Sequence, residues 1–195
     1  GFVYIAGSLR AAGYDPIYYD AMSHWHNYDE IGKRIESERP DVVATTAFTA
    51  EIVDGLKVLK LAKEINSNII TVIGNVHPTF CYEEMLKDGS TPVDYIVRGE
   101  GEETMVDLMN VLSSGGDLSK VRGIAYRDNG NIVATPARDF IKDLDTLPLA
   151  WDLVDWPIYT YRTMKNSRLA IVSSSRGCSQ QCSFCSQQLF WQRKW

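Results

Sequence analysis

The sequence contains no apolar run that approaches the ~20 residues a helix needs to cross a bilayer. It also lacks an excess of basic side chains, because 20 lysines and arginines face 25 aspartates and glutamates, giving a formal net charge of −5. Proteins that bind nucleic acid usually carry a positive patch, so nucleic acid is not an expected partner. The remaining composition, 45% hydrophobic and 23% charged, is typical of a globular domain.

Cysteine and histidine are scarce, with four and three copies in 195 residues. Nothing at the start of the sequence resembles a secretory signal, so we expect a reducing, cytoplasmic environment in which disulfides do not form. Three of the cysteines nevertheless fall close together, as Cys178, Cys182 and Cys185, in the spacing C-x3-C-x2-C. The fourth, Cys81, lies far earlier in the chain.

This spacing allows two metal interpretations, of which zinc is the weaker. Structural zinc usually takes four ligands, often with histidines among them, and no histidine follows Cys185. An iron–sulfur cluster of four irons normally takes four cysteine thiolates, so three thiolates leave one iron open to a cofactor or substrate. We therefore predict that Cys178, Cys182 and Cys185 ligate such a cluster. For Arg176 the alternatives are a charge that helps to deprotonate the thiols and a solvated side chain.

Apolar side chains recur at helical spacing in some segments and form short continuous runs between them. Strands that alternate with helices in this way indicate an α/β fold, a Rossmann-like parallel sheet covered on both faces. Ligands of such sheets bind at the carboxyl ends of the strands, which here selects the loops 45–50, 74–80 and 98–102. The predicted helices are 1–13, 28–38, 51–65, 82–87 and 101–112, and the predicted strands are 16–20, 42–46, 69–73 and 95–97.

The character of the sequence changes after Gly115-Gly116. Residues 121–126 and 131–134 flank Asp128-Asn129-Gly130, a favourable hairpin turn, and a β-prone run at 169–172 leads into the cysteines. Both ends of the sequence look cut, so we expect a piece of a longer chain. The predicted division is a front domain at 1–116, a β-hairpin linker at 117–167 and the start of a second domain at 168–195.

The C-x3-C-x2-C motif, with Phe184 before its last cysteine, is similar to the signature of the radical S-adenosylmethionine (SAM) enzymes. With the alternating sheet in front of it, the chain resembles the cobalamin-binding branch of that family over nearly its full length. Around the cysteines it is most similar to the tetrapyrrole cyclases of this branch. The other motifs that carry the resemblance are Gly74-Asn75-Val76-His77-Pro78-Thr79 (G-G-x-H-P-T in the family), Arg98-Gly99-Glu100-Gly101-Glu102 (R-G-E-G-E) and Gly123-Ile124-Ala125-Tyr126 (G-I-A-Y).

The resemblance implies a fold and a set of cofactors. The front domain would be a cobalamin-binding sheet whose first strand is not in this chain, and the second domain would be the start of a radical SAM β/α barrel. The cofactors would be a [4Fe-4S] cluster, SAM chelated by its open iron, and cobalamin over the carboxyl ends of the strands. The residues expected to contact cobalamin or SAM are Thr45, Thr46, Thr49, Gly74, Asn75, Val76, His77, Arg98, Gly99, Glu100, Gly101 and Phe184.

The implied activity is that of a cobalamin-dependent radical SAM enzyme, in particular an anaerobic oxidative cyclase that acts on a magnesium-porphyrin monomethyl ester. Its expected partners are this small-molecule substrate and an electron donor such as flavodoxin or ferredoxin. Two alternatives remain open. One is a methyltransferase of the same branch, in which methylcobalamin delivers the methyl group, and the other is a corrinoid-binding module without catalysis.

Several of the implied cofactor contacts also have simpler interpretations. Thr49 is placed to cap the helix that follows it, and His77 to brace its own loop. Glu102 is placed in the first turn of a helix, where its charge favours the helix dipole. His77 is not assigned as a cobalt ligand, because the D-x-H-x-x-G signature of histidine-ligated cobalamin does not occur.

The aromatic side chains around the cysteines leave two alternatives open as well. Phe184 either lies beside the adenine of SAM or fills the mouth of a barrel. The aromatic end of the chain, with Phe190, Trp191 and Trp195, either lines a cavity of porphyrin size or packs within a barrel.

Overall fold

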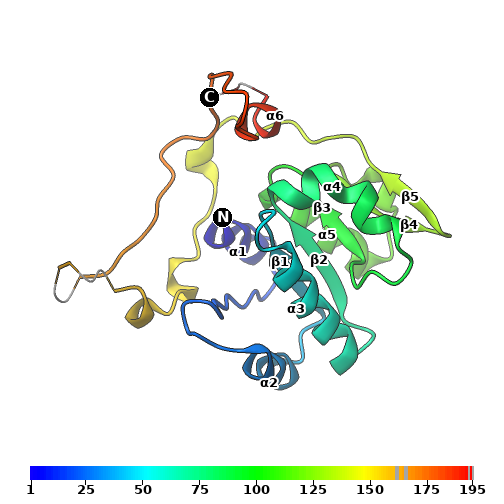
Figure 1. Ribbon diagram of the computed structural model, residues 1–195, viewed down its shortest axis with the longest axis horizontal. Coiled ribbons are helices and arrows are strands. Elements are labelled where there is room, and N and C mark those ends of the chain that lie inside the picture. Colours follow the sequence, from blue (N-terminus) through cyan, green and yellow to red (C-terminus); the bar gives the residue numbers. More distant parts are fainter. Residues whose placement is uncertain (161–162, 165–166, 193, 195) are drawn as a thin grey trace.

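The computed structural model describes residues 1–160, 163–164, 167–192 and 194. Its centre is one five-stranded sheet with the strand order β1-β2-β3-β4-β5 (Figure 1). The first three strands run parallel, and the last two are antiparallel. The predicted α/β fold is thereby confirmed. The strands are Val42–Thr46 (β1), Ile70–Gly74 (β2), Tyr95–Val97 (β3), Ile124–Asp128 (β4) and Asn131–Ala134 (β5).

The β-hairpin belongs to this sheet, although the sequence placed it in a linker. β3 pairs along its whole length with the first part of β4, with Val97 opposite Ile124. The pairing is favoured because it buries Ile124 and Tyr126 of β4 in the main apolar cluster. The antiparallel hairpin therefore completes the edge of the sheet next to β3.

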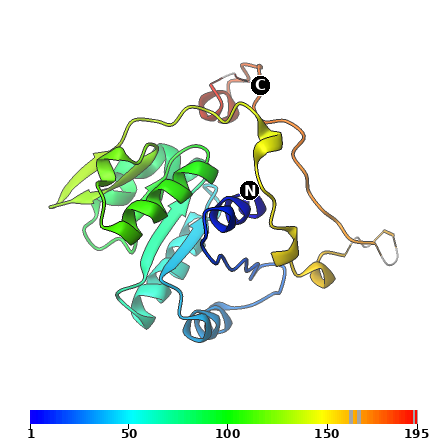
Figure 2. The same ribbon diagram turned by 180° about the vertical axis from the view of Figure 1, so that it is seen from behind.

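Helices cover both faces of the sheet. α1 (Phe2–Ala11) and α5 (Glu102–Ser114) pack together on one face, which is nearer the viewer in Figure 2. α3 (Ile52–Ile65) and α4 (Val76–Lys87) cover the other face, and α2 (Tyr28–Glu38) packs on α3. The apolar stripes of α1, α3 and α5 face the sheet, as the sequence periodicity predicted, whereas that of α2 packs on α3.

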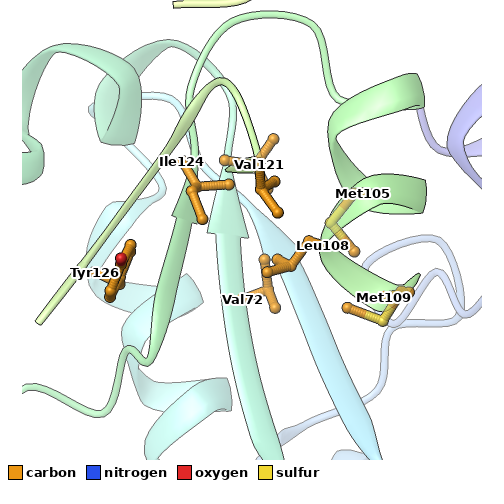
Figure 3. Close-up of a cluster of buried hydrophobic side chains, with 8 residues drawn as sticks. Val72, Met105, Leu108, Met109, Val121, Ile124 and Tyr126 are labelled. Atoms are coloured by element: carbon orange, nitrogen blue, oxygen red, sulfur yellow. The ribbon is translucent and has the colours of Figure 1, made fainter. Parts of the chain in front are cut away.

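The largest apolar cluster lies between α5 and the sheet (Figure 3). Leu108 of α5 and Ile124 of β4 are fully buried there, next to Val72 of β2. The cluster therefore joins a parallel strand, an antiparallel strand and the helix that follows β3, and it fixes the position of the loop between β3 and α5.

Two predicted strands do not form. Residues 16–20 lie in an irregular segment, where the hydroxyl of Tyr159 donates to Asp20 and also hydrogen-bonds the hydroxyl of Tyr18. Residues 169–172 are likewise irregular, with the side chains of Ile171 and Val172 largely exposed. A strand is stable only beside a partner strand, and within the described residues neither run has one.

Helix α4 begins six residues earlier than the sequence predicted, at Val76 instead of Tyr82. The predicted loop 74–80 is thus mostly the first half of a helix, which accepts Pro78 because proline is tolerated in a first helical turn. Cys81 has non-helical backbone angles (φ −107°, ψ 18°), so a kink separates this half from the predicted one.

The chain after β5 crosses the carboxyl ends of the strands, runs past α1 and returns to this edge at α6 (Gln187–Phe190; Figure 1). An exposed salt bridge between Arg10 and Asp152 joins this segment to α1. Among the described residues, no helix is long and apolar enough to span a membrane. The short 3₁₀ helices are Leu118–Lys120 (η1), Leu144–Thr146 (η2), Trp151–Leu153 (η3) and Trp156–Ile158 (η4).

The turn between β2 and α4 generates a stability prediction. Asn75 adopts φ 86° and ψ −168°, a conformation that is almost exclusive to glycine and costs other residues about 1–3 kcal/mol. Its side-chain oxygen offsets part of this cost by accepting from the backbone N–H of Val76 at 2.8 Å. We expect Asn75→Gly to raise the free energy of unfolding, since relief of strain exceeds the loss of the cap.

Asn75→Ala should lower the free energy of unfolding by about 1 kcal/mol, because alanine keeps the strain and loses the cap. Urea unfolding of the unaltered protein, Asn75→Gly and Asn75→Ala gives their free energies of unfolding, which should decrease in the order glycine, asparagine, alanine. An alanine variant as stable as the glycine variant would show that the turn is not strained.

Candidate functional site

Three loops meet at the carboxyl ends of β1, β2 and β3, and hydrogen bonds connect them. The N–H of Ala47 after β1 donates to the carbonyl of Gly74 at 3.1 Å, and the N–H of His77 donates back to the carbonyl of Ala47 at 3.3 Å. The N–H of Gly99 after β3 donates to the hydroxyl of Thr79 at 3.0 Å. The three loops that the sequence selected are therefore one continuous surface.

Close backbone approach explains the glycines of this surface. A Cβ on Gly74 would lie 3.3 Å from the carbonyl oxygen of Val97, a contact that needs the neighbouring strand to give way. Gly99 has a φ of 79°, in the left-handed region that side chains disfavour. Glycine is thus required at the end of β2 by its close packing on β3, and after β3 by the backbone conformation.

His77 lies in the first turn of α4 and contacts the loop after β1. Its Nδ1 is 3.1 Å from the hydroxyl of Thr49, which is exposed. Thr49 does not cap α3, because the cap residue of that helix is Glu51 and no side chain provides the bond. The pair instead braces two of the three loops.

Two polar atoms below this surface are buried without a hydrogen-bond partner in the described structure: the hydroxyl of Thr45 and Nε of Arg98. Thr45 faces α3, since a Cβ on Gly55 would lie 3.6 Å from that hydroxyl. The guanidinium of Arg98 lies 4.5 Å from the ring centre of Tyr82, and its Nη1 donates to the carbonyl of Thr135 at 3.2 Å. These side chains support the loops from beneath, whereas Thr46 is half-buried at the end of β1.

The carboxylates of Glu100 and Glu102 bind Arg176, the arginine that precedes the first clustered cysteine. Its Nη1 lies 2.7 Å from Oε1 of Glu100, and its Nη2 lies 2.7 Å from Oε1 of Glu102. The side chains of the two glutamates are only 4% and 6% exposed, and that of Arg176 is 15% exposed.

Neither sequence alternative for Arg176 is correct. It is not a solvated side chain, and its charge is already neutralised by two carboxylates instead of being free to act on the thiols. Burial works to lower the pKa of Arg176, but hydrogen bonds to Glu102 and Glu100 outweigh it, and the pKa is raised. The two carboxylates therefore favour the charged form of the guanidinium.

The three clustered cysteines lie on one loop and are free thiols. Cys178 and Cys185 are half-buried, and Cys182 is exposed. The carbonyl of Cys182 accepts from the N–H of Cys185 and from the side chain of Gln188, both at 3.1 Å, which gives the loop a turn. Phe184 at its tip is 91% exposed.

The donor set of this loop fits a three-thiolate cluster. Within the described part of the chain, the three cysteine side chains do not converge as a ready-made metal site, so the fit lies in the number and kind of donors. Its cysteines, being free and at least partly exposed, can all be reached by an incoming cluster.

Several side chains of the site were not singled out from the sequence. Thr79 is the last residue of the G-G-x-H-P-T motif, and this motif could have marked it as a residue of the site. The contacts of Tyr82 and Thr135 with Arg98 could not be predicted, because each residue comes from a different part of the chain. The aromatic end of the chain packs on α4 through Phe190, and Trp195 lies outside the described residues.

Comparison with known proteins gives these features a context. The model of the B12 binding domain family matches residues 1–109. The chain is 43% identical to the anaerobic magnesium-protoporphyrin IX monomethyl ester cyclase of Rubrivivax gelatinosus, over 96% of this chain and 34% of that protein. It is 34% identical to an uncharacterised methyltransferase of Pyrococcus horikoshii, over 100% of this chain and 42% of that protein. The chain thus spans less than half the length of these relatives.

Solved structures share the fold. OxsB, a cobalamin-dependent S-adenosylmethionine radical enzyme solved with aqua-cobalamin and S-adenosylmethionine bound, matches with a TM-score of 0.61 and 23% identity, over 71% of this chain and 20% of that one. TsrM of Kitasatospora setae, a radical S-adenosylmethionine methyltransferase solved with cobalamin and a [4Fe-4S] cluster, matches with a TM-score of 0.59 and 14% identity, over 78% of this chain and 30% of that one. Since the family model covers more than half of the sequence, the chain belongs to the B12-binding domain family.

Proposed function

We propose that the chain is part of a cobalamin-dependent radical SAM enzyme. One observation carries the proposal: a loop with three free cysteines in the spacing C-x3-C-x2-C contacts the carboxyl edge of a B12-binding sheet, through Arg176 and the glutamates after β3. The cobalamin-binding half of such an enzyme is represented by the fold of the sheet. The radical SAM half is represented by the three cysteines. We assign residues 1–116 together with the β4–β5 hairpin to the front domain, the rest of 117–167 to the linker, and 168–195 to the start of the barrel.

Cobalamin would lie on the three connected loops. When bound, it supplies a cobalt centre for redox or methyl-transfer chemistry, which the protein positions. Gly99 after β3 has open space beside it where a ring can approach, and the braced Thr49–His77 pair offers polar atoms nearby. The residues of the predicted set that we expect to hold it are Thr46, Thr49, Gly74, Asn75, Val76, His77, Gly99 and Gly101, with Thr45 and Arg98 beneath them.

The [4Fe-4S] cluster would be held by Cys178, Cys182 and Cys185, with SAM at the iron that has no thiolate. When bound, the cluster supplies one electron for cleavage of SAM. Thiolates bind metal only when deprotonated, and the partial exposure of these thiols allows their protons to leave to solvent. Phe184 extends from the loop next to Cys185, where a planar side chain can cover the adenine of SAM.

The relatives favour a cyclase over a methyltransferase. The 43% identity to the cyclase of Rubrivivax gelatinosus exceeds the 34% identity to the methyltransferase of Pyrococcus horikoshii, and both extend over nearly all of this chain. We therefore propose ring closure on a magnesium-porphyrin monomethyl ester, in a reducing compartment and with an electron donor of the flavodoxin or ferredoxin type. Methyl transfer is the second candidate, and a corrinoid-binding module without catalysis is the third.

Cysteine replacement in the full-length protein tests the cluster. Cys178→Ala, Cys182→Ala and Cys185→Ala each remove one of three protein ligands, so iron bound after anaerobic reconstitution should fall by about tenfold or more. Cys81→Ala is the matched control, because Cys81 lies in the kink of α4, and it should retain its iron. Bound zinc in place of iron in the unaltered protein would contradict the assignment.

Isotope-labelled SAM separates the two chemistries. With the methyl group of SAM labelled and the magnesium-porphyrin monomethyl ester as substrate, a cyclase leaves the label out of the product. Transfer of the label into product would establish the methyltransferase. An absence of SAM cleavage in this assay would favour the binding module.

A further inference from the structure

Glu100, Arg176 and Glu102 form a buried unit that joins two distant parts of the chain, and we call it the carboxylate–arginine clamp. The two glutamates flank Gly101, the cap residue of α5, and the arginine lies two residues before Cys178. Each Nη of the guanidinium bonds a different carboxylate at 2.7 Å. The forked guanidinium places a separate nitrogen on each carboxylate, whereas a lysine ammonium would have to serve both carboxylates from one atom.

The remaining charge of the clamp is also compensated. Two carboxylates and one guanidinium leave one negative charge in a site that is nearly closed to solvent. The N–H of Ile141 donates to the second oxygen of Glu100 at 2.6 Å, and Glu102 lies in the first turn of α5, where the helix dipole favours negative charge. The ring of Tyr4 lies 5.2 Å from the guanidinium carbon. The clamp thus connects α1, the loop after β3, the linker and the cysteine loop.

Chain geometry then limits the position of the first cysteine. Two residues span at most about 7 Å, so the backbone of Cys178 stays close to that of Arg176. Gly177 between them has a φ of 96°, a backbone conformation that favours glycine. The clamp therefore fixes where the cysteine loop begins.

A second contact holds the other end of the loop. Phe190 of α6 meets Phe80 of α4 edge-on, with ring centres 6.3 Å apart, and Trp191 packs on Phe140 at 5.7 Å. The cysteines lie between these aromatic contacts and the clamp. The loop is thus attached to the carboxyl edge of the sheet on both sides.

We infer that the carboxylate–arginine clamp is a positioning unit: it holds the cysteine loop against the sheet edge, and Glu100 and Glu102 act on this loop rather than on the corrin. The inference rests on the proposed function for its consequence, which is a fixed separation between the cluster and cobalamin. It differs from the prediction that Glu100 contacts cobalamin, because both oxygens of that carboxylate accept from the protein.

The test compares variants of the full-length protein by hydrogen–deuterium exchange. Arg176→Met should raise exchange in the cysteine-loop amides by about tenfold while the sheet amides keep their protection. Arg176→Lys keeps the charge without the fork and should give a smaller rise. Arg10→Met is the matched control, because it removes an exposed salt bridge between α1 and Asp152, and should leave the loop unchanged.

A triple variant keeps the test decisive if Arg176→Met does not fold, since that change leaves two carboxylates buried without a partner. Arg176→Met with Glu100→Gln and Glu102→Gln removes all three charges at similar volume, and its loop should still exchange faster. A role in fold stability alone would instead accelerate exchange in the sheet as well. A loop as protected as in the unaltered protein would overturn the inference.

Cobalamin binding distinguishes the clamp from the earlier assignment. The Glu100→Gln and Glu102→Gln variants should bind hydroxocobalamin within about threefold of the unaltered protein. A loss of about tenfold or more in either variant, with an unchanged loop, would make the glutamates corrin contacts and overturn the inference. If the unaltered protein binds no cobalamin, the proposed function fails, whereas the exchange experiment still tests the clamp.

Discussion

Parallel pairing of β1, β2 and β3 is the constraint on which the rest of the structure depends. It brings three loops from separate parts of the chain to one edge, where the hydrogen bonds of Ala47, His77 and Gly99 connect them. The apolar cluster around Leu108 holds α5 against the sheet and so sets the direction of the loop after β3. From that loop, Glu100 and Glu102 reach the arginine of the cysteine loop.

The periodic part of the fold could be predicted from the sequence. Helices α2, α3 and α5 were predicted to within two residues at either end, because each has an apolar stripe that only a helix can bury. The runs 16–20 and 169–172 have equally good local patterns and form no strands. A strand depends on a neighbour for its hydrogen bonds, and the local sequence does not say whether a neighbour is present.

The residues of the candidate site likewise fall into those that local sequence predicts and those that depend on distant parts of the chain. The three cysteines and the three loops could be found because motif spacing and strand ends are local features. The position of Arg176 could not, since its partners lie more than seventy residues away and the pairing depends on how the chain returns to the sheet. Asn75 lies between these cases: the motif marks the position as a glycine in the family, and its φ of 86° gives the physical reason.

In the proposed arrangement, one cofactor lies on the sheet and the other on a loop fixed to the edge of that sheet. The arrangement depends on the claim that the three connected loops hold cobalamin. The most direct measurement is an anaerobic electron paramagnetic resonance titration of the full-length protein with cob(II)alamin. We predict a base-off spectrum without nitrogen coupling from the lower axial position, because the sequence lacks the histidine-ligand signature. Nitrogen coupling that disappears in His77→Ala would contradict this and make His77 the ligand, and an absence of binding would contradict the claim itself.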